Sequence, residues 1–195
     1  MTFIVGFNGP PQCGKDTMAK LFLQHMDAQG VMIPVMTKPL SWPLRLMAHV
    51  MIGRTYQTVD YERFKEEYFE SFKCTGRQLM INCSECFLKP TYGLGALSKM
   101  FIESIEESFP MLVVIPDSGF QCEIEPLCEH YGAENVYMVR IHREGCTFEN
   151  DSREYVTHPL PTHNMDVTND GTIKDLATEA GRLYGRLVNQ RGWQL

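Results

Sequence analysis

The stretch FIVGFNGPPQCGKDTMAKLF, residues 3–22, joins a short apolar run to a glycine-rich turn and then to a helical pattern. The apolar run is typical of a buried parallel strand. Residues 15–28 predict a helix, because apolar residues such as Met18 and Phe22 recur on one stripe. The stretch therefore predicts a strand, a tight turn and a helix in direct succession.

The turn carries the spacing of a phosphate-binding loop, Gly, four residues, Gly and Lys. Glycine lets the backbone approach a ligand closely, and the N–H groups at a helix start attract anions. Lys15 is placed to reach the β- and γ-phosphates of a nucleotide. A plain structural turn with a solvated lysine is the alternative. The predicted ATP- and phosphate-binding residues here are Gly9, Pro10, Gln12, Cys13, Gly14, Lys15, Asp16 and Thr17.

One position departs from the usual loop, because Asp16 stands where Ser or Thr is expected and Thr17 follows it. Thr17 is therefore the predicted hydroxyl ligand of Mg²⁺. Asp16 suits the positive end of the helix dipole as a structural contact, or it orders water around the metal. The Gly-Lys-x-Thr order looks like the loop of nucleoside monophosphate kinases.

Composition narrows the class of protein. The chain has 195 residues, a net charge of −6 and a pI near 5.5, so we expect one domain, 1–195, with mobile insertions. The acidic balance disfavours a polymeric nucleic acid partner without excluding one. Seven scattered cysteines, no signal peptide and no long apolar run predict a cytoplasmic protein without membrane contact. Cys83 and Cys86 have no second pair to complete a zinc site, and packed thiols are favoured over metal or redox use.

Strand and helix patterns alternate along the rest of the chain. The expected strands are residues 2–7, 31–36, 111–115, 135–141 and 164–168, and the expected helices are 15–28, 39–52, 77–88, 94–108, 121–131 and 173–188. Residues 60–72 have a charged face and an aromatic stripe. This order predicts an α/β P-loop NTPase fold with three layers and a mostly parallel five-stranded sheet. Residues 38–108 would supply acceptor-side helices, and the polar, non-periodic residues 142–162 a lid.

Ligands of such sheets bind at the carboxyl ends of the strands, where charged residues gather. Asp117 ends the strongest strand and is a candidate to hold Mg²⁺ through water or to accept a proton, with helix capping as the alternative. Arg140, Arg143 and Arg153 lie in or beside the lid. Mobile arginines can stabilise a moving phosphoryl group, although each alone is equally consistent with a solvated surface residue.

Acceptor-binding candidates are more weakly indicated. Residues 75–93 place several charges near one helical face, which is most often simply solvated. The residues after the second strand lie at the same expected edge. The predicted acceptor-binding residues are Lys38, Arg45, Arg77, Glu85, Lys89 and Tyr92.

Four segments together carry a resemblance to a family: the Gly-Lys-Asp-Thr loop, GRQLM at 76–80, the strand ending IPDSGF and TNDGT at 168–172. In this order they resemble the phage deoxynucleoside monophosphate kinases. The resemblance implies a thymidylate-kinase-like fold, ATP and Mg²⁺ as co-substrates, and the host cytoplasm as location. It also implies that Asn169 and the residues after it contact adenine.

One departure from the family divides the acceptor prediction. Relatives often carry Arg two positions after the strand-end Asp, where this chain has Gly119. A monophosphate usually needs arginine forks, whereas a hydroxyl needs a base such as Asp117. The leading hypothesis is a deoxynucleoside monophosphate acceptor, and the alternative is the hydroxymethyl group of 5-hydroxymethyluracil in phage DNA. A nucleotide-binding module without kinase activity is a third hypothesis, and the oligomeric state is left open.

Overall fold

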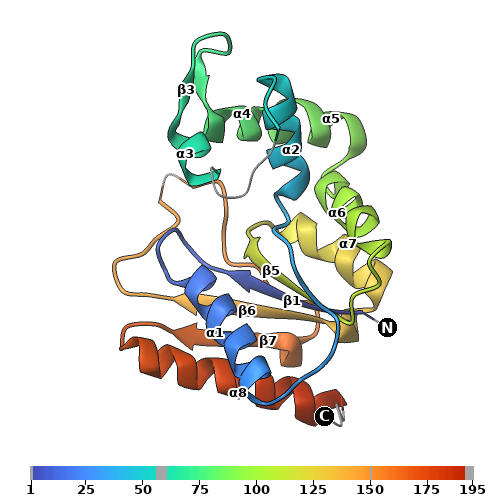
Figure 1. The fold of residues 1–195 in the computed structure, drawn as a ribbon, viewed down its shortest axis with the longest axis vertical. Helices are drawn as coiled ribbons and strands as arrows, with labels where there is room; N and C mark the ends of the chain where they lie inside the picture. Colours follow the sequence, from blue (N-terminus) through green and yellow to red (C-terminus); the bar gives the residue numbers. More distant parts are fainter. Residues whose placement is uncertain (1, 56–60, 150, 192–195) are drawn as a thin grey trace. The chain divides into compact units, whose positions relative to one another are not determined.

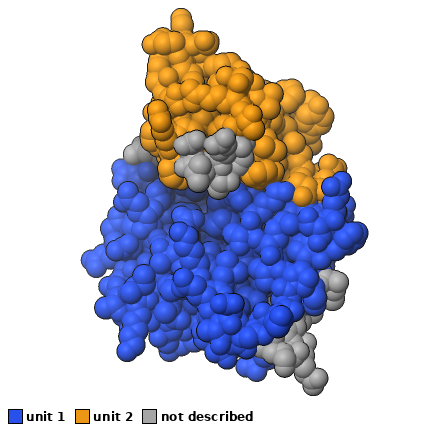
Figure 2. All heavy atoms as spheres, in the orientation of Figure 1, with its two compact units in different colours: residues 1–39, 105–195 blue, residues 40–104 orange. Residues whose placement is uncertain are grey.

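The computed structural model describes residues 2–55, 61–149 and 151–191 of the chain. Its internal contacts divide the chain into two compact units, residues 1–39 with 105–195, and residues 40–104 (Figure 2). We call the first the sheet unit and the second the helical unit. The single domain expected from the sequence stays a prediction.

The sheet unit contains a five-stranded sheet in the order β2-β5-β1-β6-β7. The strands are β1 Phe3–Asn8, β2 Val35–Thr37, β5 Leu112–Ser118, β6 Val136–His142 and β7 Asn164–Thr168. Each neighbouring pair of these strands is parallel. The predicted α/β class with a parallel five-stranded sheet is confirmed.

Helices cover both faces of this sheet, with α1 and α8 on one side and α7 on the other (Figure 1). The helices are α1 Lys15–Ala28, α7 Gln121–Tyr131 and α8 Ile173–Arg191, with short 3₁₀ turns at Ala133–Asn135 and Pro161–His163. Alternate residues of β1 divide between the two faces, because side chains of a strand alternate. The ring centroids of Phe7 and of Phe22 in α1 lie 6.3 Å apart. On the other face, Ile124 and Leu127 of α7 are fully buried.

The second strand is shorter than predicted. The sequence indicated 31–36 as a strand candidate weakened by Pro34, and β2 begins only at Val35, which pairs with Leu112. Pro34 is the physical reason, since proline has no N–H to donate to a ladder. Its carbonyl accepts instead from the N–H groups of Met111 (2.9 Å) and Leu112 (3.2 Å).

The helical unit is built around its own core, formed largely by Leu44, Ala48, Phe64, Leu79, Met80, Cys83, Leu88, Ala96 and Leu97. Its elements are α2 Trp42–Met51, α3 Tyr61–Glu66, β3 Tyr68–Phe69, β4 Cys74–Thr75, α4 Gly76–Asn82, a π-helix Cys83–Leu88, α5 Lys89–Tyr92 and α6 Ala96–Glu106, which runs two residues past the unit's boundary. The predicted helix 77–88 thus changes to a π-helix halfway. Exposed Cys86 and buried Cys83 both lie in that π-helix.

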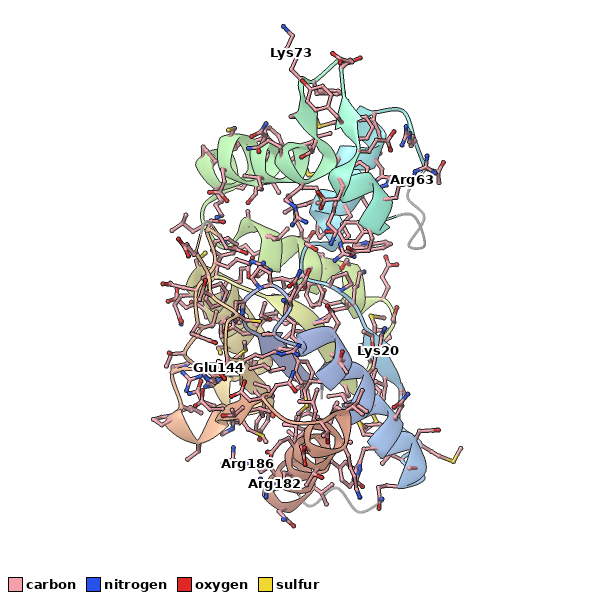
Figure 3. The ribbon with its side chains drawn as sticks, turned by 90° about the vertical axis from the view of Figure 1, so that its left-hand side faces the viewer. Lys20, Arg63, Lys73, Glu144, Arg182 and Arg186 are labelled. Atoms are coloured by element: carbon pink, nitrogen blue, oxygen red, sulfur yellow. The ribbon has the colours of Figure 1, made fainter. Side chains whose placement is uncertain are left out.

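The stretch 60–72 contains more than one element. Residue 60 lies outside the described residues, α3 ends at Glu66, and an antiparallel hairpin follows with Tyr68 opposite Thr75. Lys73 lies at the tip of this hairpin with a left-handed φ of 51° (Figure 3). A charged and aromatic alternation suits a short hairpin as well as a helix, which explains the mixed pattern.

Candidate functional site

The phosphate loop, residues 9–17, connects the end of β1 to the first turn of α1 in the order predicted. Gly9 passes so close to β6 that a Cβ there would lie 2.7 Å from the carbonyl oxygen of Ile141. Gly14 has a φ of 98°, and a side chain on it would collide with the amide of Asn169. Both glycines of the motif are therefore required by backbone geometry.

Lys15 lies folded over this loop. Its side chain is buried, and Nζ donates a hydrogen bond of 3.2 Å to the carbonyl oxygen of Pro10. Asp16 and Thr17 follow in the first turn of α1, Asp16 exposed and Thr17 half-buried. An acidic side chain is favourable there, beside the positive end of the helix dipole.

Two side chains from elsewhere contact the loop backbone. Asn169 Nδ2 donates to the carbonyl oxygen of Cys13 at 2.8 Å, and Arg143 Nη1 donates to that of Gln12 at 3.3 Å. Asn169, expected at the adenine, thus braces the loop itself. Burial raises the pKa of the Cys13 thiol, which favours the neutral form.

Arg140 is directed to the neighbouring strand. Its guanidinium makes a bidentate pair with Asp166 of β7 (2.9 and 2.6 Å), and His142 contacts the same carboxylate at 2.7 Å. The hydrogen bond from Arg140 lowers the pKa of Asp166. Of the predicted lid-side arginines, Arg140 therefore joins β6 to β7 in this structure, while Arg143 contacts the loop.

Arg153 makes the third arginine contact. Its Nε and Nη2 donate to the two carboxylate oxygens of Asp151, at 2.9 and 2.5 Å. This pairing raises the pKa of Arg153 and lowers that of Asp151. The charge of Asp117 adds to the first shift and that of Lys15 to the second. The Arg153–Asp151 pair is therefore within electrostatic range of both Asp117, near the end of β5, and Lys15 of the phosphate loop.

The end of β5 is held by a glutamate that the sequence reasoning did not select. Glu123, in the first turn of α7, is buried and accepts hydrogen bonds from the N–H groups of Gly119 (3.2 Å) and Phe120 (3.1 Å). It satisfies backbone donors at the start of this helix. Glu123 thus does the helix-capping work that was the alternative role for Asp117, which is half-buried at the strand end.

Asn8 is a second residue that was missed. It is fully buried at the end of β1 and donates through Nδ2 to the carbonyl oxygens of Ser118 (2.9 Å) and Glu154 (3.0 Å). Its Oδ1 accepts from the N–H of Val156 at 3.0 Å. An amide that closes an apolar strand, directly before a glycine-rich turn, was the signal available in the sequence.

The predicted lid, 142–162, is anchored in its second half. Besides the contacts to Asn8, the Glu154 N–H donates to the carbonyl oxygen of Gly119 at 3.1 Å. The side-chain amide of Gln121 pairs with both backbone groups of Thr157 (2.9 and 3.0 Å). Residue 150, inside the predicted lid, lies outside the described residues.

The predicted acceptor residues divide between the two units. Lys38 lies in the sheet unit just after β2, half-buried, and burial lowers its pKa. The other five lie in the helical unit. Arg77 pairs with Glu66 at 2.7 Å, and Lys89 with Glu85 at 2.6 Å.

The remaining two acceptor candidates make ring contacts within the helical unit. The guanidinium of Arg45 lies 3.7 Å from the ring centroid of Tyr61, and its Nε donates to Ser41 Oγ at 2.9 Å. Tyr92 is 61% exposed and meets Phe87 edge to face. Most of the acceptor-side charges are thus engaged locally.

The donor set fits Mg²⁺, a hard cation that prefers oxygen ligands and usually keeps several waters. Thr17 offers a hydroxyl in the first turn of α1, and Asp117 offers a carboxylate at the end of β5. Over residues 2–55, 61–149 and 151–191, no cluster of three or more His, Cys, Asp and Glu side chains forms a metal cage. Within the same ranges, no helix is both long and apolar enough to cross a membrane.

No protein-family model matches the chain, and no curated protein matches it. Solved structures with similar folds include a mutant of the Mycobacterium tuberculosis APS kinase CysC, with 16% identity, a TM-score of 0.46 and coverage of 94% of this chain and 97% of that one. The dephospho-CoA kinase of Campylobacter jejuni has 11% identity, a TM-score of 0.45 and coverage of 97% and 98%. The gluconokinase of Sinorhizobium meliloti 1021 has 11% identity, a TM-score of 0.42 and coverage of 97% of each chain. At this level the likenesses carry no argument about the substrate.

Proposed function

We propose that this chain is an ATP-dependent phosphotransferase whose acceptor is a deoxynucleoside monophosphate. The observation that carries the proposal is the phosphate loop itself. Two glycines are required by its geometry, Lys15 is folded over it, and Arg143 reaches its backbone. A loop of this kind at a helix N-terminus is a ready-made site for a nucleotide triphosphate.

Several of the predicted residues then have a role in ATP binding and phosphoryl transfer. The N–H groups of the loop and Lys15 hold the β- and γ-phosphates, and Arg143 restrains the loop from the lid side. Thr17 and Asp117 would hold Mg²⁺, which when bound would neutralise phosphate charge. Arg153 stabilises the negative charge that spreads over the transferred group. Water is excluded when residues around the transferred group close over it.

The monophosphate acceptor is supported by charge at the end of β5. Gly119 lacks the arginine that relatives often carry, but the side chain of Arg153 lies directly against it. Arg153 also lies within electrostatic range of Asp117, so a cation is available near this carboxylate even though the local motif lacks one. Arg77 and Lys38 are the further candidates to bind the acceptor, whose charge near −2 favours cations and above all the bidentate fork of an arginine.

The second candidate acceptor is the hydroxymethyl group of 5-hydroxymethyluracil in DNA. The pairing of Arg77 with Glu66 and of Lys89 with Glu85 places carboxylates on cations that a monophosphate would need, which favours an acceptor whose reacting group is a neutral hydroxyl. Asp117 would then act as general base. The flipped base would have to be bound by aromatic or apolar surfaces.

The test is transfer from γ-labelled ATP in the presence of Mg²⁺. The acceptor panel contains the deoxynucleoside monophosphates and DNA that carries 5-hydroxymethyluracil. We expect label in one or more monophosphates. Label in DNA alone overturns the leading proposal in favour of the second candidate, and phosphate release with no labelled acceptor indicates a nucleotide-binding module without kinase activity.

A further inference from the structure

The backbone of Gly119 is in contact with the stem of an arginine from a distant part of the chain. A Cβ built on Gly119 would lie 2.7 Å from Cγ and 3.3 Å from Cβ of Arg153, and closer still to its Cδ. Those three atoms are its nearest neighbours. Gly119 is not among the glycines with a positive φ, so its backbone would accept alanine. The space is therefore closed to other residues by Arg153 and not by backbone strain.

The other end of Arg153 is fixed by Asp151. Both carboxylate oxygens accept from the guanidinium, and Oδ1 also accepts from the Arg153 backbone N–H at 3.0 Å. A planar fork bound at two points has one orientation, unlike a single-point contact. The side chains of Arg153 and Asp151 are only 24% and 18% exposed, so water screens this pair poorly.

The backbone after Arg153 is fixed as well. Asn8 holds the neighbouring Glu154 and Val156, and Gly119 accepts from the Glu154 N–H. Val156 is fully buried. Three features thus fix the conformation of the Arg153 side chain: the hydrogen-bonded backbone around it, the space over Gly119 that its stem fills, and the Asp151 carboxylate that binds its guanidinium.

Charge alternates along this arrangement. The charge of Lys15 helps to lower the pKa of Asp151, which binds Arg153. The charges of Asp117 and Glu123 help to raise the pKa of Arg153. The Asp151 carboxylate thus binds the Arg153 guanidinium and lies within electrostatic range of Lys15 in the phosphate loop. Such a spacing of charges suits a polyanionic group that contacts both cations at once.

We propose that Gly119 and Asp151 are positioning residues for Arg153, Gly119 by leaving room for its stem and Asp151 by orienting its guanidinium toward the γ-phosphoryl group of ATP. The proposal rests on the proposed phosphotransferase function and deepens it. It makes the glycine a functional requirement, since a methyl group there displaces the arginine without altering any charge. A change at Gly119 therefore tests the position of the arginine, whereas a change at Arg153 tests its charge.

The first experiment measures the structural part without turnover. Thermal and urea unfolding are compared for Gly119→Ala, Arg153→Ala and the double variant. We expect Gly119→Ala to be destabilising in the parent chain and close to neutral once Arg153 has been shortened, because its clash partners are then largely gone. Strict additivity overturns the proposal, whatever reaction the chain catalyses.

The second experiment measures the functional part, again without turnover, as the ratio of the affinities for ATP and ADP. We expect this ratio to fall about tenfold in Gly119→Ala and Arg153→Ala alike, because both lose a charge-assisted contact to the γ-phosphate. ADP affinity should stay within twofold. An unchanged ratio in Gly119→Ala with a reduced one in Arg153→Ala overturns the positioning role of the glycine.

The third experiment follows transfer to the acceptor that the panel identifies. We expect kcat to fall about 100-fold in Gly119→Ala and about tenfold in Asp151→Asn, with the KM for ATP changed much less. An Asp151→Asn variant faster than the parent overturns the proposal, since the carboxylate would then be a brake. If the parent labels no acceptor, the proposed function fails, while the first two experiments still decide the positioning claim.

Matched controls come from helix α8. Gly185→Ala adds a methyl group where nothing lies within 4 Å, and Arg182→Ala removes an arginine whose ion pair with Glu179 joins residues of one helix (Figure 3). Neither change should alter the ratio of the affinities for ATP and ADP or the rate of phosphoryl transfer. A comparable loss in either control would mean that the assays report stability alone, which overturns the proposal.

Discussion

The sheet unit and the helical unit hold their charged residues in different ways. In the sheet unit, Arg143 and Asn169 reach across the sequence to the phosphate loop, and Asn8 ties β1, β5 and the lid together. In the helical unit, Arg77 and Lys89 pair with glutamates of that same unit. The first pattern holds the backbone around the predicted phosphate loop, while the second pairs charges within the helical unit, with the Arg77 side chain 52% and the Lys89 side chain 15% exposed.

This difference predicts that the sheet unit governs the reaction chemistry and the helical unit governs selectivity for the acceptor. Exposed ion pairs contribute little to stability and exchange partners readily. Buried side chain to backbone hydrogen bonds are costly to break. We therefore expect damage to the sheet unit to affect every reaction of the chain, and damage to the helical unit to affect mainly the choice of acceptor.

The strongest way to break this comparison is Lys15→Ala. The change removes the cation over the phosphate loop, and we expect transfer to fall on the order of a thousandfold for every acceptor. Initial rates with γ-labelled ATP measure it. Lys20→Ala is the control, since Lys20 is exposed on the same helix (Figure 3).

Two outcomes would contradict the assignment of the loop. Full activity in Lys15→Ala would show that the lysine does not act on phosphate. An equal loss in Lys20→Ala would show that charge on α1 matters only in general. Either result would contradict the expectation that the sheet unit carries the reaction chemistry.

The next largest effect is expected for Asn8→Ala. It leaves the buried N–H of Val156 and the carbonyls of Ser118 and Glu154 without their side-chain partner. At roughly 1 kcal/mol for each lost hydrogen bond, the sheet unit should lose about 3 kcal/mol of stability. Hydrogen exchange of the amides of β1, β5 and β6 measures this unit by itself.

Asn189→Ala is the matched change, because Asn189 is exposed on α8. It should alter protection by less than about 0.5 kcal/mol. Similar protection in Asn8→Ala and the parent chain would mean that water replaces the amide. The lid segment would then be held by Gln121 and Val156 instead.

What the sequence predicted well was governed by backbone geometry. Gly9, Gly14 and Lys15 are recognisable because few residues tolerate such a turn, and α1 begins and ends where its apolar stripe predicts. The α/β order followed from the alternation of patterns. Pro34 shows the limit, since one missing N–H moved the start of β2.

What the sequence did not predict depends on partners that are distant along the chain. Nothing in the neighbourhood of Gly119 reveals that Arg153 covers it, and nothing around Asn8 reveals its three contacts. Likewise, no local pattern reveals that Arg77 pairs with Glu66, and its role at the acceptor stays a prediction. Side-chain pairing of this kind depends on tertiary packing, which the periodicity of apolar residues in the sequence does not predict.

The pair Arg77 and Glu66 offers a way to sharpen the comparison on the helical side. If Arg77 binds the acceptor, Arg77→Ala should raise the KM for the acceptor about tenfold and leave the KM for ATP unchanged. Glu66→Gln should do the reverse for the acceptor, a decrease of about twofold, because the arginine loses its competing partner. Steady-state kinetics with both substrates varied measures each constant.

A matched pair lies in the same unit. Arg54 is bound by Glu67 through two hydrogen bonds of 2.7 Å, and Arg54→Ala should leave both constants within twofold. An increased KM for ATP in Arg77→Ala would place this arginine on the nucleotide instead. Unchanged constants in both Arg77 and Glu66 variants would remove Arg77 from the acceptor site.

The smallest expected effect is a pH dependence in the sheet unit. His158 is 1% exposed, and burial lowers its pKa from the ordinary value of 6.5. Its Nδ1 accepts from the Leu160 N–H at 2.9 Å, a bond that is lost when this nitrogen is protonated. As the pH falls through 6.5, His158 binds a proton in the unfolded chain but stays neutral in the folded chain, so the free energy of unfolding decreases.

Between pH 7 and pH 5.5 this histidine should lower the stability of the sheet unit, with a slope of at most about 1.4 kcal/mol per pH unit because one proton is involved. Asp151 and Asp166 have lowered pKa values, so their contributions are lost only in more acidic solution. Exchange protection of the β6 amides at both pH values measures the change. His158→Gln should flatten the dependence and Asn189→Ala should keep it, and an equal slope in all three proteins would assign the effect to other groups.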